Sequence, residues 1–221
     1  MKLASAIYGG SIYPFHTMGF TPFGAVINPD DLEGADALVV WGGEDISPTL
    51  YNHKINRRTG AGIIPSRRDS VEWHLMLKAV ELDIPIIGVC RGAQMLCALA
   101  GGSLYQHVDG HAGVGEHEAT DYKGVTIPVS SLHHQMLNPF GVEHEMVQWS
   151  SERRSKRYFQ EDSDNPSEQQ PAVEPEYVWF PKVKGHAIQW HPEYMDENCE
   201  ANNWLRTLWQ DRGLSWQQSQ M

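Results

Sequence analysis

The 221-residue sequence has few cysteines, no long apolar run and fewer basic than acidic residues. Its three cysteines are an odd and low number, which argues against a disulfide framework and fits a reducing compartment. No stretch approaches the ~18 consecutive apolar residues of a membrane span. The apolar residues near the N-terminus are interrupted by Ser, Gly and Pro before they could form a signal sequence. We therefore expect a cytoplasmic protein.

The charge balance excludes two classes of partner. The chain has 17 Lys and Arg against 28 Asp and Glu, a formal net charge of -11. Such an acidic surface repels phosphate backbones and anionic lipids, so we expect neither nucleic acid nor membrane as the main partner. The composition, with 41% hydrophobic residues, is ordinary for a globular protein. The length predicts a single domain over residues 1–221, with a mobile polar insertion at about 150–172.

Apolar runs and helical periodicity alternate in the first half of the chain, and a meander of strands follows. This order predicts a flavodoxin-like, doubly wound α/β fold, in which a mostly parallel sheet has helices on both faces and an antiparallel edge. A long loop is expected at 44–66, between apolar runs. The expected helices are 69–81, 93–99 and 197–210, and the expected strands are 2–8, 22–28, 36–41, 84–89, 124–129, 141–149, 177–181 and 185–190.

The stretch IIGVCRGAQ carries a thiol, Cys90, between two glycines at the end of an apolar run. In an open α/β sheet, ligands bind beyond the C-terminal ends of the strands. A tight strand-to-helix turn needs neighbours without a Cβ, which Gly88 and Gly92 provide. A helix that begins near Arg91 directs its positive end toward the thiol and favours the thiolate. The pattern predicts that Cys90 is a nucleophile.

A small buried core residue is the alternative interpretation of any free cysteine. We apply it to Cys97, which lies two helical turns beyond Cys90, and we expect Cys199 to be structural. The glycines around Cys90 favour the nucleophile there.

A cysteine nucleophile commonly needs a histidine base and a group that orients the histidine. Among 11 histidines, His191 has the most suitable setting, in QWHPE at the end of the apolar run GHAIQW. Pro192 ends that strand, which places His191 on the same rim of the sheet as Cys90. Glu193 follows two residues later, where its carboxylate could select the imidazole tautomer.

GVCRGAQ followed by QWHPE resembles the class I glutamine amidotransferase family. The stretches SLHHQ, SRRDSVEW and GGSLYQHV are similar to its γ-glutamyl hydrolase branch, peptidase C26, which includes γ-glutamyl-γ-aminobutyrate hydrolase. The resemblance covers roughly residues 36–195, with a gap over the polar insertion. It implies hydrolysis of a γ-glutamyl amide through a γ-glutamyl thioester, with Cys90, His191 and Glu193 as the triad and no cofactor.

The resemblance also implies the other site residues. Backbone N–H groups of Gly43 and Arg91 would form the oxyanion hole. The glutamyl moiety would contact Gln94 and the SLHHQ loop, the latter partly through its backbone, with Ser131, Leu132 and His133 as the candidates. The R-D-x-x-E pattern of the relatives is present as Arg68, Asp69 and Glu72. We expect it to mark a helix start, with acidic residues near the positive end.

Several histidines could be interpreted as metal ligands. The pair His133 and His134 lies in a loop without cysteine or acidic residues nearby in the sequence, so we expect solvated or packing groups and no metal. The same expectation applies to His107, His111 and His117.

Three functions remain open. The chain could be a free-standing hydrolase of glutamine or a γ-glutamyl amine, or a glutaminase subunit that delivers ammonia to a synthetase on a separate chain. It could also be a non-catalytic binding protein on the same fold, although the complete triad argues against this. A homodimer is compatible with the sequence. The amine side of the substrate would contact the segments 9–21, 44–66 and 150–172.

Overall fold

A nine-stranded mixed sheet runs through the computed structural model, which describes residues 1–6, 11–113, 115–168 and 170–212. The strand order is β2-β1-β3-β4-β13-β12-β10-β7-β8. The first five strands are parallel: β2 (Thr21–Val26), β1 (Lys2–Ala6), β3 (Ala37–Val40), β4 (Ile86–Val89) and β13 (Gly185–Ile188). The antiparallel strands are β12 (Pro175–Phe180), β10 (Glu145–Ser150), β7 (Gly115–Asp121) and β8 (Thr126–Ser131).

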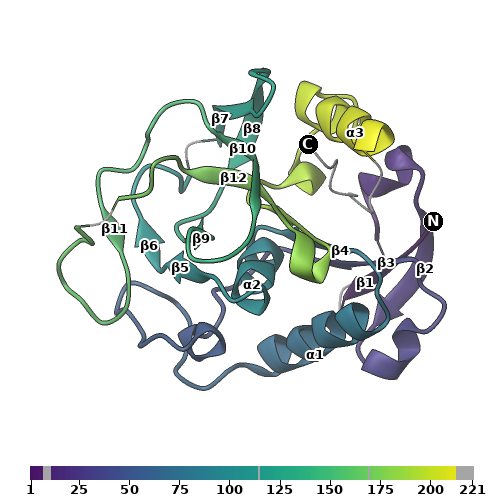
Figure 1. Ribbon diagram of the computed structural model, residues 1–221, viewed down its shortest axis with the longest axis horizontal. Helices are drawn as coiled ribbons and strands as arrows, with labels where there is room; N and C mark the ends of the chain where they lie inside the picture. The colour runs from purple at the N-terminus through teal and green to yellow at the C-terminus, as the bar shows by residue number, and fades with distance from the viewer. Residues whose placement is uncertain (7–10, 114, 169, 213–221) are drawn as a thin grey trace.

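Helices cover both faces of the parallel part. Figure 1 shows α1 (Arg67–Glu81) and α2 (Arg91–Leu99) on one side of the strands and α3 (Glu200–Arg212) on the other. The two cores follow from strand alternation. In β3, Leu38 and Val40 pack toward α1 and α2, whereas Ala37 and Val39 pack toward α3. The predicted flavodoxin-like, doubly wound fold with an antiparallel edge is confirmed.

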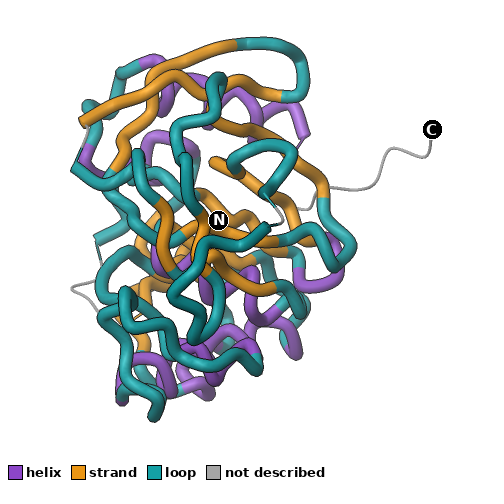
Figure 2. The backbone as a smooth tube through the Cα atoms, turned by 90° about the vertical axis from the view of Figure 1, so that its left-hand side faces the viewer, coloured by secondary structure: helices purple, strands orange, loops and turns teal. Residues whose placement is uncertain are grey.

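Two small sheets lie beside the main one. β5 (Ser103–Tyr105) pairs with β9 (Met136–Asn138), and β6 (His107–Val108) pairs with β11 (Tyr158–Phe159). Figure 2, which views the molecule from the end that carries β11, shows many loops at this end. Among them, Asn56 Nδ2 donates to the carbonyls of Glu161 and Ser163, so the segment 44–66 and the polar insertion touch.

Several boundaries differ from the sequence-based expectation. β1 ends at Ala6, and residues 7 and 8 of the expected first strand lie outside the described residues. α2 begins at Arg91, as expected from the turn at Cys90, which is two residues before the periodic stretch 93–99. β7, GEHEATD, was not expected because it is largely polar, although His117, Ala119 and Asp121 are buried in alternation. Five 3-10 turns complete the fold: Phe15–Met18, Pro29–Leu32, Pro48–Tyr51, Pro181–Val183 and Pro192–Tyr194.

Within the described residues, every helix is too short or too polar to cross a bilayer.

Candidate active site

Cys90 occupies a strained turn between β4 and α2. Its φ of 49° and ψ of -103° place a non-glycine residue in a sparsely populated backbone region. The flanking glycines make the turn fit: a Cβ on Gly88 would lie 2.5 Å from the carbonyl oxygen of Gly92, and a Cβ on Gly92 would overlap the carbonyl of Val40. The close approach of strand and helix therefore depends on both glycines, as the G-x-C-x-G spacing predicts.

His191 follows β13 and meets Cys90 at the same rim of the sheet. The side chains of His191 and Cys90 both lie against Gly42, and His191 Nδ1 lies 2.7 Å from Glu193 Oε1. Burial lowers the pKa of His191, but its interactions with Cys90 and Glu193 outweigh burial and raise the pKa to about 10. The structure thus brings the three predicted triad residues together, with the imidazolium form favoured.

Two further residues hold His191, and the sequence analysis did not assign them a role. The hydroxyl of Ser130, in β8, accepts from the backbone N–H of His191 at 2.8 Å and lies 3.3 Å from its carbonyl oxygen. The ring of Tyr194 stacks on the imidazole, with centroids 4.6 Å apart and an interplanar angle of 12°. Ser130 directly precedes the SLHHQ motif and Tyr194 directly follows QWHPE, so both lie next to motifs that could have directed attention to them.

The Gly42-Gly43 pair after β3 packs against the catalytic groups. A Cβ on Gly42 would overlap Cε1 of His191 and lie 3.5 Å from the Cβ of Cys90. Gly43 has a φ of 148°, and a Cβ there would overlap the guanidinium of Arg68. Only glycine leaves room for the backbone at both positions.

Arg68 connects this strand end to α1. Its Nη2 donates to the carbonyls of Gly42, at 2.9 Å, and Trp41, at 3.2 Å. Its Nε donates to Glu72 Oε1 at 2.8 Å. The other oxygen of Glu72 accepts from the buried guanidinium of Arg91, the first residue of α2.

The R-D-x-x-E pattern therefore does more than start a helix. The expected start is present, because Ser66 and Asp69 form a reciprocal capping box. Asp69 also accepts from Arg91 Nη2 at 2.5 Å. The side chain of Arg91 is 1% exposed and Glu72 is fully buried, so this is an interior ion-pair network beside the nucleophile.

The predicted glutamyl-binding residues lie together, but their side chains differ in direction. Gln94 is buried, with its Nε2 3.4 Å from the carbonyl of Gln135. Ser131 donates to the carbonyl of His111 at 2.7 Å, and His133 is buried against Glu176. Leu132 is half exposed. The side chains of Ser131 and His133 are thus held within the protein, which leaves the backbone of the loop for a ligand.

The five histidines considered above as possible metal ligands form two groups. His107 and His134 contact each other near the surface, and His134 Nε2 pairs with Asp45 at 3.0 Å. The second group is buried around Glu176: His111, His117 and His133. Of these, His111 and His133 form with Glu176 a set that could hold a metal ion. Cys97 is fully buried, which raises the pKa of its thiol to about 12, in agreement with its interpretation as a core residue.

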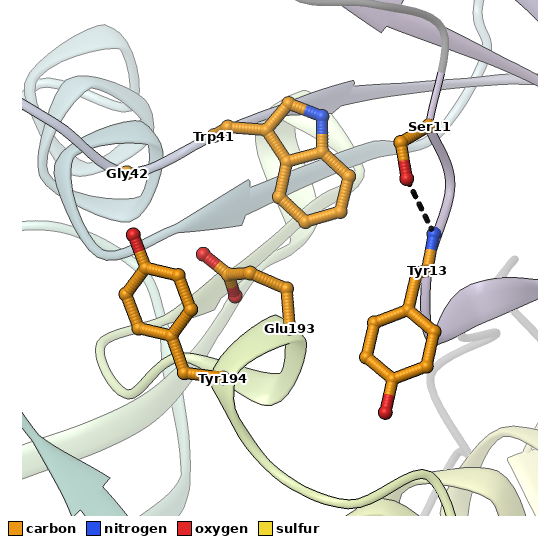
Figure 3. Close-up of a pocket in the computed structure, with 6 residues that line it drawn as sticks. All are labelled: Ser11, Tyr13, Trp41, Gly42, Glu193 and Tyr194. Atoms are coloured by element: carbon orange, nitrogen blue, oxygen red, sulfur yellow. Dashed lines mark hydrogen bonds between the residues drawn. The ribbon is translucent and has the colours of Figure 1, made fainter.

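A cavity of about 340 Å³ borders the catalytic groups. Figure 3 shows the carboxylate of Glu193 beneath the indole of Trp41, with the ring of Tyr194 beside it and Tyr13 across the opening. Residues of the segment 9–21 thus reach the site. Its lining residues are Ser11, Tyr13, Trp41, Gly42, Glu193 and Tyr194.

Comparison with known proteins agrees with this geometry. The sequence profile of the Peptidase C26 family matches residues 29–147, more than half of the chain. The chain belongs to the Peptidase C26 family. Its relatives are glutamine amidotransferase-like, which places this C26 protein in the class I glutamine amidotransferase group.

Two curated relatives illustrate the similarity. The Lactococcus lactis glutamine amidotransferase-like protein YvdE is 32% identical over 125 residues, which cover 48% of this C26 protein and 52% of YvdE. Imidazole glycerol phosphate synthase subunit HisH 2 of Parasynechococcus marenigrum is 35% identical over 82 residues, 37% of this chain and 32% of that subunit. The chain spans about half, or less, of the length of the curated relatives it matches.

Solved structures share the fold at low identity. A glutamine amidotransferase from Thermotoga maritima aligns with a TM-score of 0.56 and 14% identity, covering 96% of this chain and 83% of that one. The glutaminase domain of Trypanosoma brucei CTPS aligns with a TM-score of 0.54 and 12% identity, covering 99% and 97%.

Proposed function

We propose that this C26 protein hydrolyses a γ-glutamyl amide, either glutamine or a γ-glutamyl amine, through a γ-glutamyl thioester on Cys90. The observation that carries the proposal is the chain of contacts from Cys90 to His191 to Glu193 on the strained turn after β4. Cysteine-dependent acyl transfer requires a nucleophile, a base beside it and a group that orients the base.

The first half of the reaction forms the thioester. The Cys90 thiolate attacks the γ-carbonyl carbon, and the oxygen becomes an oxyanion. Backbone N–H groups of Gly43 and Arg91 stabilise it, and each such donor is typically worth ~3 kcal/mol in the transition state. The C–N bond then breaks as the His191 imidazolium gives its proton to the departing amine, or to ammonia when glutamine is the substrate.

The second half releases glutamate. Neutral His191 takes a proton from a water molecule, and the hydroxide attacks the thioester carbonyl. The C–S bond breaks, glutamate leaves and the thiolate–imidazolium pair is restored. Glu193, held 2.7 Å from Nδ1, keeps Nε2 directed to the reacting atoms in both halves.

Substrate contacts follow from the positions of the side chains. We assign the glutamyl moiety to Gln94 and to the backbone of Ser131, Leu132 and His133, because the side chains of Ser131 and His133 are held elsewhere. The amine side would reach the cavity beside Glu193, or a second cavity of about 360 Å³ between the segment 44–66 and Asp162 of the polar insertion.

The domain and cellular assignments belong to the same proposal. We treat residues 1–221 as a single class I glutamine amidotransferase-like domain with an insertion at about 150–172, and residues 213–221 of that range lie outside the described residues. Three free thiols favour a cytoplasmic location.

A glutaminase subunit is the second candidate. HisH 2 is by name a synthase subunit, and another relative is the small chain of a carbamoyl phosphate synthase. The chemistry would be the same, but the ammonia would pass to a synthetase on a separate chain. This candidate would be supported if the backbone N–H of Gly43 were not directed at the oxyanion in the isolated protein.

Glutamate release by the purified chain tests these proposals, with glutamine and a panel of γ-glutamyl amines as substrates. Cys90→Ala is the inactive variant and Cys199→Ala the matched control. Release from a γ-glutamyl amine that Cys90→Ala abolishes supports a free-standing hydrolase. No release, with Cys90 still labelled by a glutamine-like electrophile, favours the subunit. A chain that neither releases glutamate nor reacts with the electrophile is a binding protein, and the proposal is then wrong.

A further inference from the structure

A buried cluster of three histidines surrounds one oxygen of Glu176 on β12. Glu176 Oε1 lies 2.9 Å from His117 Nε2, 3.6 Å from His111 Nδ1 and 3.7 Å from His133 Nε2. All four side chains are at most 1% exposed. Buried polar groups without compensation are costly, so the arrangement needs an explanation.

Three of the four side chains have a spacing that suits a metal ion. With metal–ligand bonds of about 2.0–2.1 Å, neighbouring ligand atoms of a zinc site lie about 3.3 Å apart. His111 Nδ1 and His133 Nε2 lie 3.6 and 3.7 Å from Glu176 Oε1, and the candidate ligand atoms of His111, His133 and Glu176 all lie within 4.8 Å of one another. His117 Nε2 lies 2.9 Å from the same oxygen, a hydrogen-bond distance, and stands outside this set.

The hydrogen bonds that His111 and His133 make on the side away from Glu176 also fit metal binding. His133 Nδ1 lies 2.9 Å from the carbonyl of Gln135, which can only accept, so this nitrogen carries the proton. His111 Nε2 lies 3.2 Å from Glu174, whose carboxylate already accepts from two backbone N–H groups and from Tyr158. Metal-bound histidines are typically oriented by such bonds to a carbonyl or a carboxylate.

These bonds leave two ring lone pairs directed at a carboxylate. In their neutral forms, His111 Nδ1 and His133 Nε2 both face Glu176 Oε1, and neither they nor Glu176 makes a well-aligned hydrogen bond there. Lone pairs opposite a carboxylate repel each other unless a cation lies between them. A metal ion between these atoms removes the repulsion, whereas without a metal the rings or Glu176 must carry additional protons.

We infer that His111 Nδ1, His133 Nε2 and Glu176 bind one Zn²⁺ ion. Three protein ligands leave one position of a tetrahedral zinc ion to a further ligand such as water. The ion would join β12 to the SLHHQ loop, because Glu176 lies on β12 and His133 lies in that loop. Zinc binding by this cluster does not depend on the proposed hydrolase activity.

Metal content tests the inference directly. The wild-type chain, purified without a histidine tag and desalted, is expected to carry one Zn²⁺ per chain by elemental mass spectrometry. After chelation, refilling with Co²⁺ should produce the intense visible absorption of four-coordinate Co²⁺, and the melting temperature should fall on chelation and recover on refilling. Because these measurements use the wild-type chain, they remain informative if ligand variants fold poorly.

Variants then locate the ion. His111→Gln and His133→Gln should lose the metal, whereas His144→Gln should retain it, because His144 bonds to Val142 outside the cluster. Glu174→Gln should keep the ion but weaken its affinity about 10–100-fold in chelator competition, as for other outer-shell groups.

Two results would overturn the inference. One is wild-type protein that carries only trace metal and whose chelated form shows only six-coordinate Co²⁺; nitrogen NMR should then find imidazolium at His111 and His133. The other is a metal content that His111→Gln and His133→Gln leave unchanged, which would place the ion elsewhere.

Discussion

Arg68 donates from Nη2 to the carbonyl oxygen of Gly42 at 2.9 Å, and its Nε pairs with Glu72. Glu72 also holds Arg91. The two backbone segments to which we assign the oxyanion hole, at Gly43 and at Arg91, are therefore joined through one buried carboxylate. A substitution of either arginine should therefore shift the backbone N–H groups to which we assign stabilisation of the oxyanion.

Arg68→Met should lower kcat, because the carbonyl of Gly42 loses its donor and the peptide group that carries the N–H of Gly43 is no longer held in place. Loss of one oxyanion donor typically lowers kcat about 10²–10³-fold, and this is the upper limit of the expected effect. KM should change less, because Gln94 and the SLHHQ loop are untouched. Steady-state kinetics of glutamate release measures this, with Arg67→Met, on the exposed side of α1, as the control. Equal kcat values in the two variants would contradict the prediction.

Glu72→Gln should destabilise the fold. Removing one partner of a buried ion pair typically costs about 3–5 kcal/mol, because the remaining charge is left without compensation. Two cations would lose this partner: Arg91 would retain Asp69, and Arg68 is partly exposed, so the lower end of that range is expected. Urea denaturation gives the free energy of unfolding. Glu81→Gln, at an exposed i,i+3 pair with Lys78, should change it by less than about 0.5 kcal/mol.

Gly92→Ala should destabilise the turn at the nucleophile, because the new methyl group would overlap the carbonyl of Val40. Overpacking of this kind costs typically about 1–3 kcal/mol, and the backbone shift would also move Cys90. Gly141→Ala is the matched control, since a Cβ there meets nothing within 4 Å. Thermal melting of both variants decides the matter: a Gly92→Ala protein as stable as Gly141→Ala would contradict the observed packing.

The stabilising effect of His191 should depend on pH. Its pKa rises from ~6.5 in an unfolded chain to about 10 in the fold. The folded state therefore retains a proton that the unfolded state has lost, and stability declines with rising pH between these values. The advantage of wild type over His191→Gln in the free energy of unfolding should be complete below pH ~6.5 and lost as pH passes 10. Urea denaturation across this range measures it, and a constant difference would contradict the prediction.

The turn at Cys90, to which we assign the nucleophile, was predictable because its signals are local. Gly88, Cys90 and Gly92 lie within five residues, and the need for a missing Cβ can be derived from the turn alone. The parallel strands were equally clear, since strands buried on both faces are continuous apolar runs. By contrast, β7 escaped detection because its exposed positions are charged and only its inward side chains are buried.

Contacts between distant segments could not be predicted. Arg68 and Gly42 are separated by a long loop, so the R-D-x-x-E pattern indicated a helix start and nothing more. The acidic partners of the buried histidines lie far along the chain from His133: Glu176 is on β12 and Glu174 directly precedes this strand. An argument from neighbouring residues finds no acidic ligand there, whereas the antiparallel strand supplies one.

The hydroxyl of Ser130 that holds the backbone of His191 belongs to β8, at the antiparallel end of the sheet, while Gly42 and Cys90 belong to the parallel end. The thiol of Cys90 has its proposed base, His191, in place only in molecules in which both ends of the main sheet have folded. Labelling of Cys90 by a glutamine-like electrophile would therefore count correctly folded molecules, and could serve as a folding assay for any variant of this protein.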